Sequence, residues 1–293
     1  MQLADLVAAK RSGGHSLSVC LPARNEAATV GAIVQVVRNE LMVAGLVDEV
    51  VVIDDGSADA TADAAQRAGA TVFAEARVLP EAGPGSGKGN VLWKSLQACS
   101  GNLVCWLDAD LRNFRAETVI KLVEPLVIDP DIVLVKAGYT RAFEGEPTGG
   151  GRVTELVARP LLSLLFPKLA DIVQPLGGEY AGRREALEVL PFAEGWGVEI
   201  GLLVDVVERF GRDAVAQVDL GVREHRNRPV DQLSAQSLAI IATALRRAGL
   251  MQFDGPTVEL LRADLAGNVE AEQVEIRERP PIATLPAYRA THS

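Results

Sequence analysis

The stretch Cys105-Trp106-Leu107-Asp108-Ala109-Asp110 decides the fold class of this chain. A short apolar run, residues 103–107, leads into two carboxylates that are separated by one residue. Such a run predicts a buried strand of a parallel sheet. In open α/β sheets ligands bind beyond the carboxyl ends of the strands, where carboxylates must be paired or hold a cation. The stretch therefore suggests a divalent-metal site that could bridge to a diphosphate.

A second aspartate pair, Asp129-Pro130-Asp131, has a different setting. It precedes an apolar run instead of following one, and its proline favours an ordinary turn. Two aspartates one residue apart also occur by chance, so Asp108 and Asp110 alone leave a metal site and a plain strand end both open. The remaining stretches of the chain decide between these interpretations.

The composition indicates a globular and acidic chain. It has 293 residues, of which 48% are hydrophobic and 23% charged, and a formal net charge of −10. This length allows one large α/β domain or one domain with an appended piece. The acidic balance argues against a nucleic-acid partner, which would need a basic surface, but permits an anionic substrate where cations gather locally.

The cysteines and the apolar stretches predict where the protein works. Cys20, Cys99 and Cys105 share no metal-binding spacing, so we expect reduced thiols in a cytoplasmic protein. No apolar stretch reaches the roughly 18 residues of a membrane-spanning helix, so no membrane partner is expected. Lys10 and Arg11 follow the apolar residues near the N-terminus, which is the reverse of a signal peptide.

Alternating strand and helix patterns predict the order of elements. Strands are expected at 17–21, 49–53, 71–74, 103–107, 132–136 and 214–220, and helices at 26–43 (capped by Asn25), 60–68, 90–98, 117–126, 156–166, 200–210, 233–250 and 258–265. This order predicts a doubly wound, Rossmann-like α/β sheet with right-handed crossovers. Pro22-Ala23 and Asp54-Asp55 then lie at the same sheet edge as Asp108. Residues 270–293 are expected to form a loose tail or an arm that reaches a second subunit.

The glycine-rich stretch 81–90 brings Lys88 to the start of a helix. Its spacing does not fit an ATPase-type phosphate loop, which requires glycine where Ala82 stands and serine or threonine where Gly89 stands. A flexible loop that delivers Lys88 to a diphosphate remains open, and so does a solvated loop lysine.

A second glycine-rich stretch, Thr148-Gly149-Gly150-Gly151-Arg152-Val153-Thr154-Glu155, precedes an apolar helix. Backbone N–H groups at a helix start, with Arg152 beside them, would make an anion site. The alternative is a flexible linker between two halves of the chain. Arg152 and Thr154 favour the anion site.

Glu199 and His225 are the remaining candidates for chemistry. Glu199 opens an apolar helix, where it could simply complement the helix dipole, but the nearby Trp196 suggests contact with a sugar. His225 stands among Arg223, Arg226 and Arg228 in an otherwise acidic chain. An imidazole that completes a carboxylate site suits Mn²⁺ as well as Mg²⁺, and the arginines suit phosphate.

Together these motifs resemble those of the glucosyl-3-phosphoglycerate and mannosyl-3-phosphoglycerate synthase family, which are retaining glycosyltransferases of the A-type fold. The first half carries the landmarks shared by many such transferases, and the second half carries longer and more specific ones. The matching stretches are 21–26, 52–57, 107–110, 148–155, 174–180, 197–201 and 222–227. The resemblance covers about residues 16–250 and implies transfer of a hexose from a nucleoside diphosphate hexose to the 2-hydroxyl of 3-phosphoglycerate, with a divalent metal.

The resemblance also implies a division of the chain and a role for each candidate residue. A nucleotide-sugar-binding half (1–140) would be followed by an acceptor- and metal-completing half (141–250) and by a C-terminal extension (251–293) that is partly loose or associated with a homodimer. The implied donor site comprises Pro22, Ala23, Arg24, Glu26, Asp55, Lys88, Asp108, Ala109, Trp196, Glu199, Arg223 and Arg228; the acceptor site Gly151, Arg152, Val153, Thr154 and Asn227; the metal ligands Asp110 and His225; and the catalytic set Glu199, Asp110 and Lys88.

Three positions depart from the pattern of the glucosyl enzymes, namely Arg24, Ala109 and Trp196. They leave open whether the donor is UDP-glucose, which is favoured, or GDP-mannose. Three further alternatives are an inverting transferase for a lipid-phosphate acceptor, a sugar nucleotidyltransferase and a non-catalytic nucleotide-sugar-binding module. The stretch 23–26 fits a nucleotidyltransferase poorly, because such an enzyme would need a basic glycine-rich loop there.

Overall fold

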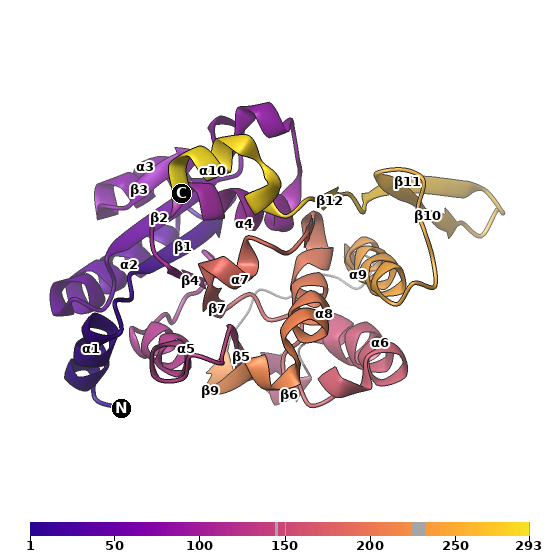
Figure 1. Cartoon of the computed structure of the whole chain (residues 1–293). Coiled ribbons are helices and arrows are strands. Elements are labelled where there is room, and N and C mark those ends of the chain that lie inside the picture. Colours follow the sequence, from indigo (N-terminus) through magenta and orange to yellow (C-terminus); the bar gives the residue numbers. More distant parts are fainter. Residues whose placement is uncertain (144–145, 150, 224–231, 293) are drawn as a thin grey trace.

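The protein is described by a computed structural model that covers residues 1–143, 146–149, 151–223 and 232–292 (Figure 1). A mixed eight-stranded sheet forms its centre, in the order β3-β2-β1-β4-β7-β5-β6 with β9 paired to β5. These strands are β1 (Leu17–Ala23), β2 (Glu49–Asp54), β3 (Thr71–Ala74), β4 (Leu103–Trp106), β5 (Leu134–Phe143), β6 (Glu146–Gly149), β7 (Tyr180–Arg183) and β9 (Val215–Arg223).

The first half of the sheet is parallel, as the sequence predicts. β1 pairs in parallel with both β2 and β4, and β2 pairs in parallel with β3. Beyond β4 the direction changes, because β7 is antiparallel to both β4 and β5, whereas β9 is again parallel to β5. The strand expected at 132–136 is therefore β5, which is separated from β4 by an antiparallel strand contributed by the second half of the chain.

Helices cover both faces of the sheet (Figure 1). They are α1 (Leu3–Ser12), α2 (Val30–Val36, continued by a π-helix at Val37–Met42), α3 (Thr61–Ala68), α4 (Gly87–Ala98), α5 (Glu117–Ile128), α6 (Arg159–Leu165, preceded by a π-helix at Thr154–Ala158), α7 (Arg184–Leu187), α8 (Val198–Phe210), α9 (Leu233–Arg247) and α10 (Pro286–His292). None of the helices in the described parts of the chain has both the length and the apolar character needed to cross a membrane.

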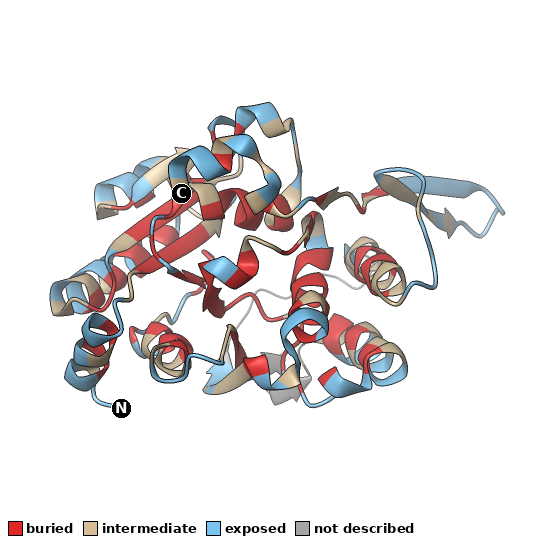
Figure 2. Cartoon of the chain, in the orientation of Figure 1, coloured by how far each residue is buried: buried red, intermediate tan, exposed pale blue. Residues whose placement is uncertain are grey.

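The core has two layers, one on each face of the sheet. Val19 and Leu21 of β1 belong to one buried cluster, and Cys20 between them belongs to the other. Alternate side chains of a strand point to opposite faces, and the central strands are mostly buried (Figure 2), as expected for largely apolar strands that are covered on both sides. This double cover explains why short continuous apolar runs marked the central strands. Cys20, Cys99 and Cys105 are free and buried, as expected.

The chain enters α2 later than expected. β1 runs through Pro22 to Ala23, and α2 begins only at Val30. Asn25 does not cap this helix. It takes a left-handed conformation with φ of 60°, its Oδ1 accepts a hydrogen bond from the N–H of Ala58, and its N–H donates to Ser57 Oγ. Asn25 instead ties the loop after β1 to the loop after β2.

Two expectations for the C-terminal region are wrong, namely the helix at 258–265 and the loose tail, whereas an arm to a second subunit stays a prediction. Residues 257–263 form strand β10 (Thr257–Ala263) instead of a helix, and β10 pairs with β11 (Val269–Glu275) in a hairpin that projects from the body (Figure 1). The following residues are not loose. β12 (Glu278–Arg279) pairs with β8 (Phe192–Ala193), and Ile282 and Tyr288 are buried.

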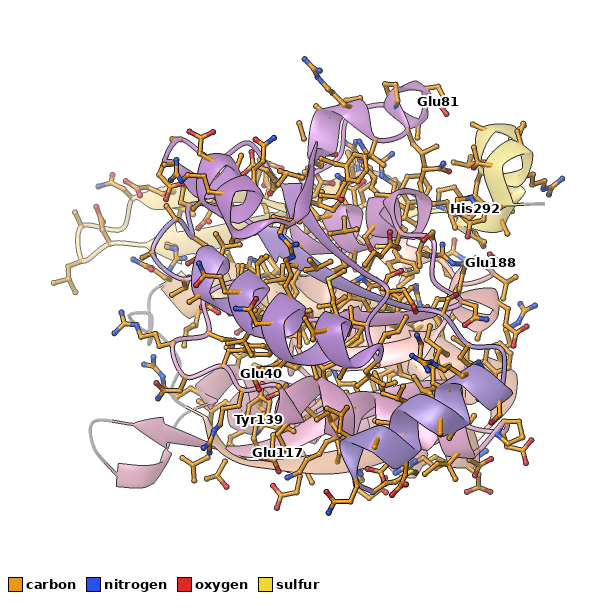
Figure 3. The ribbon with its side chains drawn as sticks, turned by 90° about the vertical axis from the view of Figure 1, so that its left-hand side faces the viewer. Glu40, Glu81, Glu117, Tyr139, Glu188 and His292 are labelled. Carbon is orange, nitrogen blue, oxygen red and sulfur yellow. The ribbon has the colours of Figure 1, made fainter. Side chains whose placement is uncertain are left out.

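The C-terminal helix α10 packs back onto the first half of the chain. Tyr288 of α10 donates a hydrogen bond to Glu188 at 2.7 Å, and Gln97 of α4 donates one to Thr291 at 2.9 Å. Figure 3 shows α10, with His292 near its end, on the side of the molecule where Glu188 lies. The end of the chain is therefore part of the packed body that surrounds α4.

Candidate active site

A cavity of about 550 Å³ opens at the carboxyl edge of the parallel strands. It is lined by every predicted site residue whose side chain the structure describes: Pro22, Ala23, Arg24, Glu26, Asp55, Lys88, Asp108, Ala109, Asp110, Gly151, Arg152, Val153, Thr154, Trp196 and Glu199. The predicted residues His225, Asn227 and Arg228 lie outside the described residues, as does the side chain of Arg223, which ends β9. The structure thus brings together stretches from both halves of the chain.

Lys88 lies at the centre of the polar cluster in this cavity. Its Nζ is 2.5 Å from Oδ1 of Asp108 and 3.0 Å from Oε1 of Glu199. Burial disfavours the ammonium, but the two carboxylates outweigh it and raise the pKa of Lys88 well above its usual value. Lys88 is therefore a fixed cation at neutral pH and not a solvated loop lysine.

The position of Lys88 follows from an early helix start. α4 begins at Gly87 and not near residue 90, so Lys88 lies in its first turn. A Cβ at Gly89 would lie 1.9 Å from the carbonyl oxygen of Ala193, so only glycine allows this approach between the two segments. Close packing thus overrides the poor helix propensity of the Gly-Lys-Gly sequence.

The loop between Gln174 and Tyr180 borders the cavity, which Leu176 lines. A Cβ at Gly178 would lie 2.2 Å from Oδ2 of Asp108 and 2.4 Å from Nζ of Lys88. Only glycine fits there, because the backbone of this loop passes directly against the ion pair. The Gly177-Gly178 sequence of the predicted loop therefore has a packing role beside the polar cluster.

Lys136 lies behind the cluster, and the sequence had marked it only as the end of a strand. Its Nζ donates a hydrogen bond to the carbonyl of Gly177 at 2.6 Å and lies 4.3 Å from the centre of the Tyr180 ring. Burial lowers the pKa of Lys136 to about 8, with Lys88 acting in the same direction and Glu199 opposing it. A second buried cation thus lies within electrostatic range of Lys88 and Glu199.

The loops after β1 and β2 form another wall of the cavity. Arg24 reaches Asp55 at 3.4 Å, and burial raises the pKa of the Asp55 carboxyl although Arg24 opposes this effect. The N–H of Glu26 donates to Thr61 at 2.8 Å, which fixes the loop. A half-buried carboxylate with an arginine beside it can accept N–H groups of a nucleotide base.

The glycine-rich stretch before α6 reaches the cavity from the second half of the chain. Gly151 has φ of 76°, and a helical segment begins at Arg152. The N–H of Glu155 is bonded to the carbonyl of Gly151, so Gly151 closes the first turn. Gly151, Arg152 and Thr154 all line the cavity, which favours the anion site over a plain linker.

The residues present fit a hard divalent cation. Asp108 and Asp110 follow β4 at the cavity wall, and Asp108 is engaged by Lys88. Carboxylate oxygens are the ligands that Mg²⁺ and Mn²⁺ take together with phosphate oxygens. Within the described residues, no group of three or more His, Cys, Asp or Glu side chains surrounds one position, so the described side chains by themselves form only part of a coordination shell.

Some lining residues were missed by the sequence analysis. They are Gly87, Val91, Leu176, Gly195, Leu233 and Gln236. Leu233 and Gln236 come from the first turns of α9, an amphipathic helix in which a polar side chain looks like ordinary surface. The one usable signal was the position of this helix directly after the arginine-rich stretch.

The sheet, its Asp-Ala-Asp edge and a cavity shared by both halves of the chain define a glycosyltransferase of the A type. Residues 18–190 match the family model "Glycosyl transferase family 2". The chain is 46% identical over 287 residues to glucosyl-3-phosphoglycerate synthase of Mycolicibacterium smegmatis. This alignment covers 97% of this chain and 93% of the relative. It is 43% identical to the enzyme of the same name from Petrotoga mobilis, with 99% of this chain and 93% of the relative covered.

Solved structures give the same result. The crystal structure of glucosyl-3-phosphoglycerate synthase from Mycobacterium tuberculosis in complex with Mn²⁺, UDP-glucose and phosphoglyceric acid has a TM-score of 0.85 and 46% identity, with 97% of this chain and 95% of that chain covered. The complex of the same enzyme with Mg²⁺ and UDP has a TM-score of 0.86 and 45% identity, with 97% and 96% covered. The chain therefore belongs to glycosyl transferase family 2, and within it to the group of the glucosyl-3-phosphoglycerate synthases. The predicted family and fold are confirmed.

Proposed function

We propose that this protein transfers glucose from UDP-glucose to the 2-hydroxyl of 3-phosphoglycerate, with retention at the anomeric carbon and with Mg²⁺ or Mn²⁺. The observation that carries this proposal is the position of Lys88 between Asp108 and Glu199, in a cavity that residues 22–26 and 151–154 line together. The high identity to enzymes named for this product over nearly the whole chain supports it.

The donor would lie along the carboxyl edge of the parallel strands. Its base would lie against Pro22, Ala23, Arg24 and Glu26, with Asp55 accepting an N–H. Its ribose and sugar would contact Asp108, Ala109, Trp196 and Glu199. The exposed indole of Trp196 offers an apolar face, and the carboxylate of Glu199 can accept hydroxyl groups of the hexose.

Asp110 would hold the metal together with His225, which lies outside the described residues. When bound, a divalent cation neutralises charge on the diphosphate and orients it. Lys88 adds a second positive charge at the same place, and Arg223 and Arg228 would assist it. The chain as a whole is acidic, so these cations together would offset the repulsion between the protein and an anionic donor.

The acceptor would be held by the second half of the chain. Its phosphate and carboxylate would contact the N–H groups of Gly151, Val153 and Thr154 and the guanidinium of Arg152, with Asn227 beside them. In this proposal an anionic acceptor would lie opposite the donor across one cavity. The division into a donor half (1–140) and an acceptor half (141–250) belongs to this proposal.

The reaction needs one bond to break and one to form. The bond from the anomeric carbon to the β-phosphate oxygen breaks, and the 2-hydroxyl oxygen of 3-phosphoglycerate bonds to that carbon on the same face. The hydroxyl proton passes to the departing phosphate oxygen. Lys88 stabilises the negative charge that develops there, and Glu199, held by Lys88, orients the hexose close to the reacting carbon.

We also propose that the protein works in the cytoplasm. We propose further that it forms a homodimer, joined through the β10–β11 hairpin. A two-stranded hairpin is marginally stable by itself in water. One of its faces turns toward α9, whereas Leu261 and Val269 on the other face are 60% and 61% exposed. A second copy of the chain would cover these two apolar side chains. Leu261→Glu combined with Val269→Glu should then yield a monomer in light-scattering measurements, and an unchanged mass would contradict the dimer.

An assay with purified components tests the reaction. The protein is incubated with 3-phosphoglycerate, Mg²⁺ and, in parallel, UDP-glucose, GDP-glucose or GDP-mannose. We expect an α-linked glucosyl phosphoglycerate from UDP-glucose, identified by NMR from its anomeric coupling. A mannosyl product would move the protein to the mannosyl enzymes. Tight UDP-glucose binding without transfer would favour a non-catalytic module, and hydrolysis of the donor alone would point to another acceptor.

A further inference from the structure

The loop before Lys88 is held by a residue from the far end of the chain. This glycine loop, residues 83–86, leads directly into the first turn of α4. Arg279 of β12 donates from Nη1 to the carbonyl of Ala82 at 2.8 Å and from Nη2 to the carbonyl of Gly83 at 3.2 Å. One guanidinium therefore fixes the start of the loop.

The same guanidinium also reaches the other end of the loop. Its Nε donates to Oδ1 of Asn90 at 2.9 Å and lies 2.7 Å from Oε1 of Glu194. The second oxygen of Glu194 accepts the N–H of Ser86 at 3.0 Å. Arg279 is only 6% exposed and Glu194 only 1%, so this ion pair is shielded from solvent and its geometry is enforced.

The neighbours of Arg279 strengthen this attachment. We call residues 277–279 the C-terminal strap. Arg277 donates to the carbonyl of Pro84 at 3.2 Å. Glu278 lies 2.5 Å from Nη1 of Arg247 on α9, and Arg246 donates to the carbonyl of Ile276 at 2.9 Å. The strap thus connects α9, which lines the cavity, to the glycine loop, which carries Lys88 into it.

Two glycines at the end of this loop, Gly85 and Gly87, lie in close packing. A Cβ at Gly85 would lie 2.1 Å from Nη2 of Arg279 and 2.2 Å from Oδ1 of Asn90. A Cβ at Gly87 would lie 2.8 Å from Cα of Gly195, next to Trp196 in the cavity wall. The backbone of residues 85–87 therefore lies close to Arg279 of the strap on one side and to the segment that leads to Glu199 on the other.

We propose that Arg279 is a positioning residue for the donor site, and that through Glu194 and the glycine loop it holds Lys88 between Asp108 and Glu199. This inference rests on the proposed function, because Lys88 is taken to bind the donor diphosphate. It assigns the C-terminal strap to the donor-binding machinery, although the strap touches no predicted substrate group. Loss of Arg279 frees the loop and misplaces the Lys88 ammonium, while the acceptor residues 151–154 stay in place.

The experiment compares Arg279→Gln with the unchanged protein. UDP binding is measured by calorimetry with Mn²⁺ present, and the KM values for UDP-glucose and 3-phosphoglycerate are measured separately. We expect the UDP affinity to fall about tenfold and the KM for UDP-glucose to rise with it, while the KM for 3-phosphoglycerate stays within about twofold. UDP affinity equal to that of the unchanged protein would overturn the proposal.

Arg183→Gln is the matched control. Arg183 is also a buried arginine, 8% exposed, and donates to the carbonyls of Ile132 and Asp129 at 2.8 and 2.9 Å, away from the cavity. We expect it to lower the melting temperature without changing UDP affinity. If it weakened UDP binding as much as Arg279→Gln does, the effect of Arg279 would be general destabilisation and the proposal would be wrong.

A milder variant covers the case in which Arg279→Gln does not fold. Arg277 is 40% exposed, so Arg277→Ala should fold, and it removes one bond from strap to loop. We expect UDP affinity to fall about two- to threefold, and unchanged affinity would count against the strap. Should the unchanged protein bind UDP yet form no glucosyl product, the proposed reaction would fail, while the UDP comparison would still decide the role of Arg279.

Discussion

The Nζ of Lys88 lies 3.0 Å from Oε1 of Glu199, although the two residues belong to helices that are more than a hundred residues apart in the chain. The two helix starts meet because glycines at 87 and 89 let the backbones of the two segments approach each other. The pair joins the donor half of the chain to the segment that carries Trp196. The charges of Lys88 and Glu199 therefore lie where they could act on both the donor and the acceptor of a transfer reaction.

Replacing Lys88 should separate binding from folding. Lys88→Met leaves Asp108 and Glu199 close together without their shared cation, so a diphosphate meets two carboxylates instead of an ammonium. We expect kcat to fall by about a hundredfold or more, as for other groups that stabilise developing charge. Steady-state kinetics checks this expectation. Lys121→Met, at an exposed lysine paired with Glu117, is the control and should keep full activity.

The two aspartate pairs allow a direct test of the metal site. Asp110→Asn should abolish Mn²⁺-dependent transfer, to below about 1% of normal, because the amide is a poorer ligand for a hard cation. Asp129→Asn alters the other pair, which forms a turn in which Asp129 accepts the N–H of Asp131 at 2.9 Å. We expect it to leave transfer unchanged. Electron paramagnetic resonance measures Mn²⁺ binding. Normal Mn²⁺ binding by Asp110→Asn would contradict the assignment of Asp110 as a metal ligand.

Chelation of the metal is a complementary measurement. EDTA should stop transfer, and either Mg²⁺ or Mn²⁺ should restore it, since both ions take oxygen ligands of this kind. The far-ultraviolet circular dichroism should stay the same in EDTA, because Asp110 lies at the cavity wall and not in the core. Full transfer in excess EDTA would remove the ion from the proposed chemistry.

Arg152 should govern the acceptor and not the donor. Arg152→Gln removes a guanidinium from the cavity wall, and we expect the KM for 3-phosphoglycerate to rise about tenfold or more while UDP affinity is unchanged. Arg159→Gln is its matched control, because the Arg159 side chain is 38% exposed, pairs with Glu155 at 2.8 Å and does not line the cavity. A donor KM that rose in parallel with the acceptor KM would contradict the separation of the two subsites.

The pKa of Lys136 makes a prediction about stability. Burial lowers the pKa of Lys136 from 10.5 to about 8. Below about pH 8 the folded protein therefore holds a charged ammonium in its interior, whereas in the unfolded chain the same ammonium is in water. The unfolded state therefore binds more protons between these values, and the free energy of unfolding rises with pH. Between about pH 7 and about pH 9.5, the free energy of unfolding of the natural protein should rise by about 2 kcal/mol relative to that of Lys136→Met. Urea denaturation measures the free energy of unfolding of both proteins at each pH. The difference between the two proteins would not change with pH over this range if Lys136 titrated normally.

The central strands and most of the site were predictable for one physical reason. Strands β1, β2 and β4 are covered on both faces, so each is largely apolar, and β2 and β4 lead into aspartates at the ligand edge. Asp55, Asp108 and Asp110 therefore stood out as carboxylates that directly follow such runs. The second-half residues 151–154 and Glu199 were found from glycine and helix-start patterns, and their place in the cavity agrees with the family resemblance.

What could not be predicted depends on contacts between distant segments. Residues 258–265 were expected to form a helix, and the pairing of β10 with β11 makes residues 257–263 a strand. Lys136 looked like a strand end, yet burial beside Tyr180 gives it an unusual pKa. Arg279 lay in a tail with no periodicity, and its role comes from carbonyl groups almost two hundred residues earlier in the chain.

The three tryptophans are distributed so that the protein carries its own optical reporter. Trp93 and Trp106 are fully buried, whereas Trp196 is 37% exposed at the cavity wall. Trp196 should then contribute most of the long-wavelength part of the intrinsic fluorescence. A nucleotide sugar that settles against this indole would change its emission, so occupancy of the cavity can be titrated in solution without a label.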